Sequence, residues 1–328
     1  MSDILLDVRN LSVRLPSRRG DLSAVESVSF TVGTSEIVGI AGESGSGKTL
    51  SVLALLGLLP PGGVAAGTAH FRGQDLLALN RRQLRSVRGG EIAVVFQDPM
   101  NTLHPMLTVG RQLTEHQRVH RSVAKRVARD RALELLDVVR IPNPAEAFDK
   151  HPHHFSGGMR QRIAIAMALA CEPKLLIADE PTTALDVTVQ AGILRLIDRL
   201  RRETDLSVVL ITHDLGVLSS IADRLYVFYS GRVVESGDTA AILAHPRHPF
   251  TEGLLEALPD PDRPERPLTP ITGVPPVLGQ QIPGCRFHPR CRYALEECRT
   301  AVPPLIQLSP ARTAACPPDP LRVPEVAG

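Results

Sequence analysis

An apolar stretch that runs into a glycine-rich turn and then a helical pattern constrains this chain more than any other feature. The run IVGIAGESGSGKT occupies residues 37–49. Gly42, four further residues and then Gly47-Lys48-Thr49 fit the P-loop pattern, in which backbone N–H groups surround phosphates at a helix N-terminus. Lys48 would reach the β- and γ-phosphates, and the Thr49 hydroxyl would bind Mg²⁺. The sequence therefore predicts a nucleotide site on a strand–loop–helix unit.

A dinucleotide-binding fingerprint is the alternative interpretation of the same glycines. Gly45 and Gly47 have the first G-x-G spacing, but the third glycine of that fingerprint would fall at position 50, which is Leu50. The P-loop interpretation is therefore favoured. The residues expected at the phosphates are Gly42, Glu43, Ser44, Gly45, Ser46, Gly47, Lys48 and Thr49.

Composition sets the broad class of the protein. The 328 residues, 43% of them hydrophobic, suit one large domain with an appendage. With 37 basic and 35 acidic residues the net charge is +2, so the overall charge does not indicate nucleic-acid binding. The N-terminus lacks the basic segment of a signal peptide, and prolines 60 and 61 stop the apolar run after Lys48 before it could cross a bilayer. We expect a cytosolic chain.

The order of sequence patterns predicts an α/β fold. Alternating apolar and polar residues at 4–14 and 25–32 predict a β-rich N-terminal layer ahead of the P-loop. Helical spacing replaces the strand signal between 109 and 170, which indicates an inserted helical subdomain. Strand patterns then return at 174–178 and 207–212, so we assign residues 1–245 to one P-loop domain.

Three apolar strands end in polar side chains. Gln97, Asp179-Glu180 and His213 each follow such a strand, and sites in α/β proteins lie at the carboxyl ends of strands. Asp179 would hold Mg²⁺ and Glu180 would polarise water, which is the Walker B arrangement. Either acid alone could merely cap the following helix. The preceding P-loop favours the catalytic interpretation.

Two other polar stretches are interpreted as surface features. Residues 120–131 carry six basic side chains and one aspartate, and no aromatic residues interleave to stack on bases, so a solvated helix face is favoured over nucleic-acid contact. His151, His153 and His154 lie in a proline-containing loop without a carboxylate pattern. A metal site there is not favoured.

The composition changes beyond residue 245. Residues 246–328 are rich in proline, are linked through 260–264, and are too poor in apolar periodicity to form a core alone. They contain four of the five cysteines, Cys285, Cys291, Cys298 and Cys316. The spacing lacks the tight C-x₂-C pairs of most metal sites, so metal ligation and free thiols both remain open. Cys171 lies in an apolar helical stretch and is expected to be a core residue.

Taken in chain order, the motifs resemble those of an ABC transporter ATP-binding subunit. They are the P-loop, Gln97, the signature Ser156-Gly157-Gly158, Asp179-Glu180, Asp186 and His213. The run from Glu180 to Gln190 and the segment that begins at His248 resemble more narrowly the bacterial dipeptide/oligopeptide importer ATPases. The resemblance implies an ABC ATPase core with a Cys/Pro-rich C-terminal extension.

The resemblance also implies how each motif acts. Two such domains pair head to tail, and each ATP lies between the P-loop of one and the signature helix of the other. Glu180 corresponds to the general base, His213 to a γ-phosphate contact and Gln97 to the residue that senses the membrane subunits. The implied Mg²⁺ ligands are Thr49, Gln97 and Asp179, and the implied contacts from the facing domain are Ser156, Gly157, Gly158 and Asp186.

The function that the resemblance implies is ATP hydrolysis that powers import of di- or oligopeptides. The implied partners are a sister ATPase subunit, two permease chains and an extracytoplasmic substrate-binding protein, with this chain peripheral at the cytoplasmic face of the membrane. Nickel-chelate and glutathione importers share this ATPase type and remain alternatives. A soluble ABC ATPase acting on DNA or ribosomes is disfavoured, because only 106 residues separate Thr49 from Ser156 and the chain has a single P-loop.

Two details of the resemblance concern adenine and the cysteines. The family's aromatic residue that stacks on adenine is missing from the turn after Leu15, so adenine is expected to rest on Leu15 or on the plane of Arg18 or Arg19. The run from Gly284 to Cys291 resembles the C-terminal motif of peptide-importer ATPases, some of which bind a [4Fe–4S] cluster. The resemblance therefore favours a cluster on Cys285, Cys291, Cys298 and Cys316 over zinc or free thiols.

Overall fold

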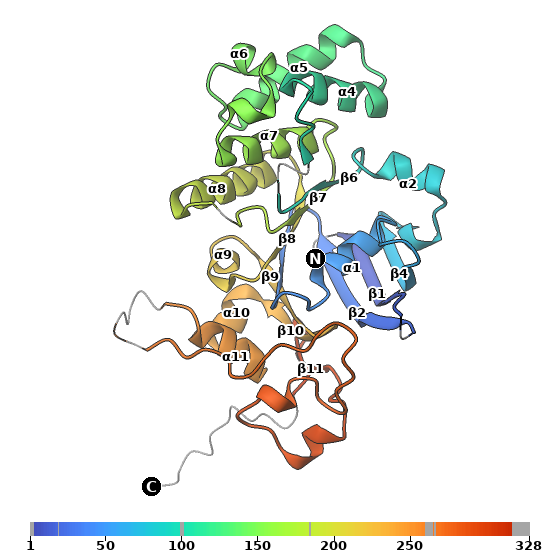
Figure 1. The fold of residues 1–328 in the computed structure, drawn as a ribbon, viewed down its shortest axis with the longest axis vertical. Helices are drawn as coiled ribbons and strands as arrows, with labels where there is room; N and C mark the ends of the chain where they lie inside the picture. Colours follow the sequence, from blue (N-terminus) through green and yellow to red (C-terminus); the bar gives the residue numbers. More distant parts are fainter. Residues whose placement is uncertain are drawn as a thin grey trace. The chain divides into compact units, whose positions relative to one another are not determined.

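The computed structural model describes residues 3–18, 20–98, 102–183, 185–259, 265 and 267–316. The chain divides into two compact units (Figure 1). Unit 1 comprises residues 1–3, 32–37 and 78–210, and unit 2 comprises 4–31, 38–77 and 211–328. The linker expected at 260–264, Arg19 and Ala184 lie outside the described residues.

The N-terminal layer of unit 2 is a four-stranded sheet. Its strands are β1 (Ile4–Leu15), β2 (Leu22–Gly33), β4 (Val64–Phe71) and β5 (Gln74–Asp75), in the order β2-β1-β4-β5. β4 is antiparallel to both β1 and β5. Leu6 and Val8 are almost fully buried because alternation in β1 directs every second side chain to one face. Val13 is buried as well, beyond a register shift between Arg9 and Ser12 that changes which positions face inward. The β-rich layer predicted from that alternation is confirmed.

A second group of strands in unit 2 carries the P-loop. It comprises β3 (Ile37–Ala41), β9 (Arg224–Tyr229), β10 (Arg232–Asp238), β11 (Ile306–Ser309) and β12 (Arg312–Ala314), in the order β11-β12-β10-β9-β3. β3 pairs parallel with β9, whereas the pairs β9–β10, β10–β12 and β11–β12 are antiparallel. The helices of this unit are α1 (Lys48–Leu55), α9 (Leu215–Ser219), α10 (Thr239–Ala244) and α11 (Pro249–Glu256).

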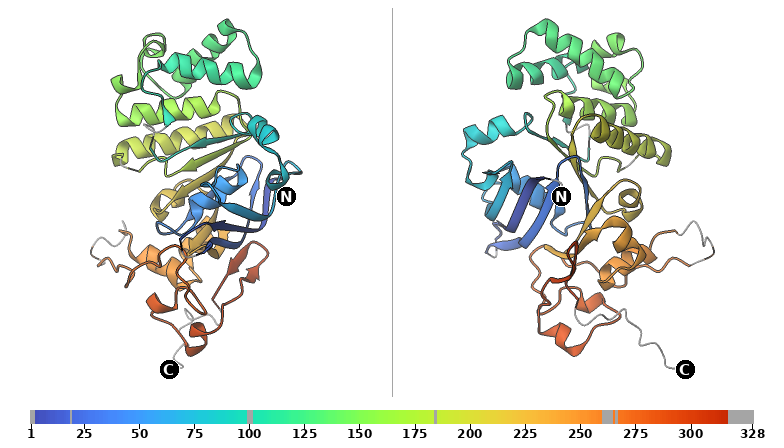
Figure 2. Two further views of the ribbon diagram at one scale, coloured as in Figure 1. Left: turned by 45° about the vertical axis from the view of Figure 1, so that its right-hand side comes forward. Right: turned by 180° about the vertical axis from the view of Figure 1, so that it is seen from behind.

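The C-terminal extension is an integral part of unit 2. Its proline-rich sequence did not indicate strands, yet β11 and β12 form a hairpin that pairs with β10 (Figure 2). Arg312 donates to the carboxylate of Glu235 over 2.7 Å, and Glu235 is fully buried. Phe287 packs against Tyr229 and Phe250, with ring centroids 5.1 and 5.5 Å apart. Strand pairing, a buried ion pair and aromatic packing therefore hold the extension in place. The sequence indicated only that residues 246–328 could not form a core alone.

Unit 1 combines parallel strands with helices. Its strands are β6 (Ile92–Val95), β7 (Leu175–Asp179) and the first part of β8 (Ser207–Thr212), in the order β8-β7-β6. β6 and β7 are parallel, so the residues that follow them emerge at the same end. The helices are α2 (Arg81–Val87), α4 (Val109–Arg121), α5 (Lys125–Val138), α6 (Pro144–Phe148), α7 (Gly157–Leu169) and α8 (Val187–Glu203).

The residues from α4 to α7 are helical or in loops throughout the part that the structure describes (Figure 1). Thr108 caps α4 by accepting from the backbone N–H of Arg111, and the apolar side of α5 is buried at Ala128, Ala132 and Leu136. This arrangement agrees with the helical spacing of the sequence. The subdomain limits of 109 and 170 and the domain boundary at 245 stay predictions.

None of the helices in the described residues combines the length and apolar character that a membrane span requires.

Candidate functional site

The P-loop of unit 2 connects β3 to α1 through three glycines with positive φ. Gly42, Gly45 and Gly47 have φ values of 147°, 77° and 96°. A Cβ atom at Gly42 would lie 2.3 Å from the carbonyl oxygen of Phe228, so only glycine fits where the loop passes β9. The backbone N–H of Gly231 donates to the carbonyl of Ser46 over 2.9 Å. The hairpin turn between β9 and β10 thus supports the loop from one side.

Lys48 and Ser46 supply polar groups inside this loop. The ammonium of Lys48 donates to the carbonyl oxygens of Gly42 and Glu43 over 2.7 and 2.9 Å. Its side chain is buried, and so is the Ser46 hydroxyl, which has no hydrogen-bond partner among the described residues. Thr49 follows in the first turn of α1. A cradle of glycine backbone, an ammonium and a spare hydroxyl at a helix N-terminus fits a phosphate group.

The Walker B carboxylates of unit 1 lie at the end of β7. Asp179 is the last residue of the strand and is 7% exposed. Glu180 follows with a φ of 47°, a backbone conformation that non-glycine residues adopt rarely. Its Oε2 accepts a hydrogen bond from Nε2 of Gln97 and another from Oγ1 of Thr183, both 2.9 Å long. The side-chain orientation of Glu180 is therefore fixed by two donors.

The signature motif begins α7. Ser156 is the N-cap residue, and its Oγ accepts from the backbone N–H of Met159 over 3.4 Å. A Cβ atom at Gly158 would lie 2.5 Å from Cγ1 of Val189 on α8, whereas one at Gly157 would lie 3.6 Å from Leu185. Close packing of α7 on α8 thus requires glycine at 158. Ser156 and Gly157 are exposed at the helix start.

Asp186 and His213 have simpler surroundings. Asp186 is the N-cap of α8, and its Oδ1 accepts from the backbone N–H of Val189 over 2.9 Å. His213 is exposed in unit 2 directly after β8. Within unit 1 the structure brings Gln97 and Glu180 together and places the signature helix against α8. The P-loop and His213 belong to unit 2.

An ion pair that was not predicted contacts the P-loop. Arg290, in the C-terminal extension, donates through Nη1 and Nη2 to the two carboxylate oxygens of Glu43 over 2.6 and 2.8 Å. The Arg290 side chain is only 5% exposed. The guanidinium and carboxylate are 247 positions apart in the sequence, and no local pattern connects them. Thr183 was likewise not predicted to contact Glu180.

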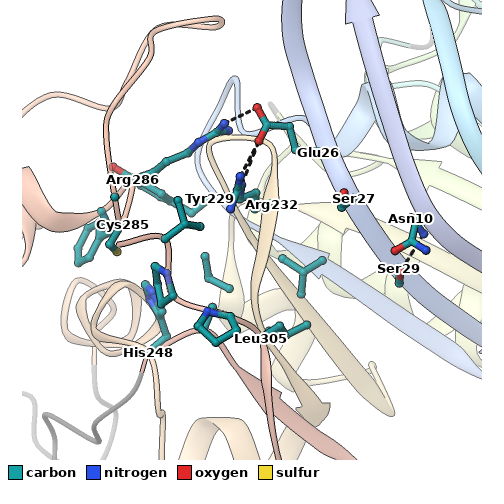
Figure 3. A pocket seen from close by; sticks show the side chains of 18 residues that line it. Asn10, Glu26, Ser27, Ser29, Tyr229, Arg232, His248, Cys285, Arg286 and Leu305 are labelled. Carbon is teal, nitrogen blue, oxygen red and sulfur yellow. Dashed lines mark hydrogen bonds and ion pairs between the residues drawn. The ribbon is translucent and has the colours of Figure 1, made fainter. Parts of the chain in front are cut away.

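Charged side chains also line a pocket of about 430 Å³ beside the extension (Figure 3). Arg232 and Arg286 both point at Glu26, which accepts from Arg232 through Oε2 and from Arg286 through Oε1. Burial opposes ionisation of Glu26, but the hydrogen bonds from Arg232 and Arg286 outweigh it and lower the pKa to about 2. Arg286 also donates to the carbonyl of Ser230, which is in the β9–β10 turn that supports the P-loop.

The four cysteines of the extension line one small pocket of unit 2. Burial raises the pKa of Cys285 and of Cys291, and neighbouring thiols add to the effect. Across the part of the chain that the structure describes, no three His, Cys, Asp or Glu side chains gather closely enough to hold a metal ion. His151, His153 and His154 are included in that finding and pack on one another.

Cys171 belongs to unit 1. It is 2% exposed, and burial raises its pKa to about 11. The prediction of a core thiol is confirmed.

Comparisons with known proteins agree with these motifs. Residues 25–183 match the family described as "ABC transporter", and residues 234–298 match "Oligopeptide/dipeptide transporter, C-terminal region". A further match, to an AAA domain of a type IV toxin system, covers residues 151–219.

Individual relatives match along almost the whole chain. The oligopeptide transport ATP-binding protein OppD of Salmonella typhimurium is 45% identical to this chain, and the match covers 96% of this chain and 94% of the length of OppD. The dipeptide transport ATP-binding protein DppD of Escherichia coli is 47% identical to this chain, and the match covers 95% of this chain and 96% of the length of DppD. Among solved structures, the dimeric ABC transporter cassette MJ0796 aligns with a TM-score of 0.64 at 28% identity, over 71% of this chain and 98% of that one.

Proposed function

The chain belongs to the ATP-binding subunits of ABC transporters, and on that premise we propose that it hydrolyses ATP to power a membrane importer of di- or oligopeptides. The observation that carries the proposal is the end-to-end similarity to OppD and DppD, which extends through the C-terminal region. We further propose the division into an ATPase domain, residues 1–245 with a helical subdomain at about 109–170, and an extension, residues 246–328.

The geometry of each motif supports a role in hydrolysis. The positive-φ glycines and Lys48 would bind the phosphates of ATP, because they form the loop that leads into the N-terminus of α1. Glu180 would act as general base on the attacking water, with Gln97 and Thr183 fixing its orientation. His213 would contact the γ-phosphate. Thr49, Gln97 and Asp179 would hold Mg²⁺, which when bound neutralises phosphate charge.

Two copies of the ATPase fold complete this mechanism. Ser156, Gly157 and Gly158 at the exposed start of α7 would bind the γ-phosphate held by a facing subunit, and Asp186 would contact that subunit. The dimeric MJ0796 cassette supports pairing of such domains. We propose a sister ATPase subunit as the partner, two permease chains as the membrane component, and a substrate-binding protein that delivers the peptide. This chain would then be peripheral at the cytoplasmic face of the membrane.

Reconstitution tests this function. The chain, its sister subunit and the two permeases are placed in lipid vesicles that contain ATP, and labelled dipeptides or oligopeptides are added with the binding protein. We expect peptide transport that requires ATP and is lost when Lys48→Ala replaces the wild-type chain. ATP hydrolysis with no peptide transport, while a nickel chelate or glutathione is transported, would overturn the peptide assignment.

For the cysteines of the extension we propose a [4Fe–4S] cluster. Four thiols that line one pocket fit the ligand set of such a cluster. Zinc would require four sulfurs about 2.3 Å from one ion, and the described residues include no group of three or more His, Cys, Asp or Glu side chains arranged to hold a single metal ion. A cluster binds each thiolate through a different iron and therefore suits thiols that lie farther apart. Cys285, Cys291, Cys298 and Cys316 would hold it, and it would stabilise the extension.

Anaerobic purification tests the cluster. We expect about four irons per chain, a visible absorption band, and loss of both in the Cys291→Ala variant. The Cys171→Ala variant is the control, because that thiol lies outside the pocket, and it should retain the iron. A colourless, iron-free protein whose four thiols are freely alkylated would show that no cluster is present.

A further inference from the structure

The contact between Arg290 and Glu43 joins the cysteine-rich extension to the phosphate-binding loop. Both oxygens of the Glu43 carboxylate are held by the guanidinium, over 2.6 and 2.8 Å. This two-pronged pairing fixes the relative orientation of an arginine and a carboxylate more firmly than a single hydrogen bond does. The backbone carbonyl of Glu43 in turn accepts from Lys48. One residue therefore connects the extension to the lysine of the P-loop.

Arg290 is itself held rigidly. Its Nε donates to the carbonyl of Thr272 over 3.0 Å, and Nη1 also reaches the hydroxyl of Tyr229 at 3.3 Å. The guanidinium lies 5.9 Å from the ring centroids of both Tyr229 and Phe287. With the side chain 5% exposed, water does not screen the pair as it would a surface ion pair. Arg290 is thus a fixed cation directed at the loop.

The charge of Glu43 explains why such a cation is needed. A carboxylate in a loop that binds phosphates repels them, and the repulsion is stronger where solvent is excluded. Arg290 neutralises that carboxylate. It also restricts the motion of a loop whose glycines are conformationally permissive, and such pre-organisation raises affinity.

A second contact of the same segment reaches the other side of the loop. Arg286 donates to Glu26 and to the carbonyl of Ser230. The next residue, Gly231, donates to the carbonyl of Ser46 in the P-loop over 2.9 Å. Only three residues separate Arg286 from Arg290. The two arginines directly follow Cys285 and directly precede Cys291, respectively. The short segment between these two cysteines therefore supports the P-loop at two points.

We propose that Arg290 is a positioning residue for nucleotide binding, which neutralises Glu43 and holds the P-loop, so that the cysteine-rich extension is coupled to nucleotide affinity. This inference rests on the proposed assignment of the P-loop as the ATP site. In this proposal the side chains of Arg290 and Glu43 act through the loop, and no direct contact of these two side chains with the nucleotide is assigned.

Titration of the full-length chain with ADP tests the proposal without interference from hydrolysis. Coupling between two sites in one protein commonly changes affinity by about 5- to 150-fold, and we expect a weakening in this range for Arg290→Ala. Glu43→Gln removes the charge that repels phosphate, and because Glu43 is itself a P-loop residue, the ADP affinity of this variant is measured as the reference for the double variant. The double variant should resemble Glu43→Gln, because Arg290 has no charge to neutralise once Glu43 is uncharged.

Arg292→Ala is the matched control. Arg292 lies two residues away in the same extension and makes an equally two-pronged pair, with Glu256 at 2.8 and 2.8 Å, but that pair involves α11 and not the P-loop. We expect its ADP affinity to equal that of wild type. Thermal unfolding of each variant shows whether the extension remains folded.

The possible results distinguish failure of the coupling proposal from failure of the nucleotide-site assignment. Recovery of affinity in the double variant supports the proposal, since mere disruption of the extension by Arg290→Ala would not be repaired by Glu43→Gln. Equal affinities of Arg290→Ala, Arg292→Ala and wild type would overturn it, as would a double variant no better than Arg290→Ala. A wild-type chain that binds no ADP would instead overturn the assignment of the nucleotide site.

Hydrogen exchange supplies an independent readout. Because thermodynamic coupling is reciprocal, ADP should slow amide exchange in residues 285–291 of the wild-type chain. The protection should disappear in Arg290→Ala and persist in Arg292→Ala. Protection that is identical in all three proteins, or absent from all three, would show that Arg290 does not carry the coupling.

Discussion

The side-chain amide of Gln97 donates to Oε2 of Glu180 over 2.9 Å, although the two residues are 83 positions apart. They meet because β6 and β7 are parallel neighbours, so their carboxyl ends lie at the same end of the strands. Thr183 donates to the same oxygen. A residue that follows β6 therefore directly contacts the carboxylate to which we assign the role of base.

Replacement of Glu180 by Gln should leave ATP binding intact and lower hydrolysis by about 10²- to 10⁴-fold, because the general base is lost. Nucleotide affinity and steady-state ATPase activity of the assembled transporter measure the two effects. Thr183→Val is the comparison, since it removes one donor to Glu180 and should cost about tenfold or less. Near-normal hydrolysis in the Glu180→Gln transporter would assign the base elsewhere.

Substitution of Ser156 by Ala should affect hydrolysis only when two ATPase domains meet. The hydroxyl caps α7, so we also expect a loss of about 1 kcal/mol in stability. ADP affinity of the isolated chain should be unchanged while ATPase activity of the transporter falls. If the isolated chain lost its nucleotide affinity, the signature would not act on the facing subunit's nucleotide.

Gly158→Ala should destabilise unit 1, because the added methyl would lie 2.5 Å from Val189 and force α7 away from α8. Overpacking of this kind costs about 1–3 kcal/mol. Urea denaturation measures the loss, and the Gly158→Ala/Val189→Ala double variant should recover part of it. Gly157→Ala, with a nearest contact of 3.6 Å, should be milder. Equal losses for the two single variants would contradict this packing argument.

Acidification should destabilise unit 2 through His248. Burial lowers the pKa of this histidine to about 3, and its Nδ1 accepts from the backbone N–H of Phe250. Below its unfolded pKa of about 6.5 only the unfolded chain takes up the proton, so the free energy of unfolding falls as pH decreases towards 3. The backbone N–H of His248 donates to Glu235, whose charge is balanced by Arg312.

The comparison with His248→Asn isolates this effect, because asparagine can still cap α11 but does not titrate. Between about pH 7.5 and about pH 5.5 the wild-type protein should lose about 1 kcal/mol more than the variant in urea denaturation. Glu26 does not interfere, since its pKa is lowered to about 2 and its contribution is lost only at more acidic pH. Identical pH profiles of the two proteins would contradict the assignment.

The fold around the P-loop was predictable because its signals are local. Strand alternation in β1, the apolar run of β3 and the polar residues that end β6 and β7 are all encoded within a few neighbouring positions. The hydrophobic effect and backbone sterics act on such short patterns directly. The fold class followed from them.

The remaining features depend on contacts between distant segments. The hairpin of β11 and β12 has only four and three residues, too short for a periodicity signal in a proline-rich stretch. Its pairing with β10 decides its structure. The Arg290–Glu43 pair and the second donor to Glu180 have no sequence pattern either, because an arginine or threonine becomes a partner only once the chain is folded. A salt-bridged arginine and a solvated one look alike in a sequence.

The pairing of β12 with β10 also has a consequence for solubility. An edge strand of a sheet presents unpaired N–H and C=O groups that can pair with strands of other molecules. Glu235 and Ser236 in β10 face Ala314 and Thr313 in β12, so this part of β10 is shielded by the chain's own last described strand. A chain truncated before residue 306 would expose it. Such a truncation should aggregate during expression even where the P-loop itself folds.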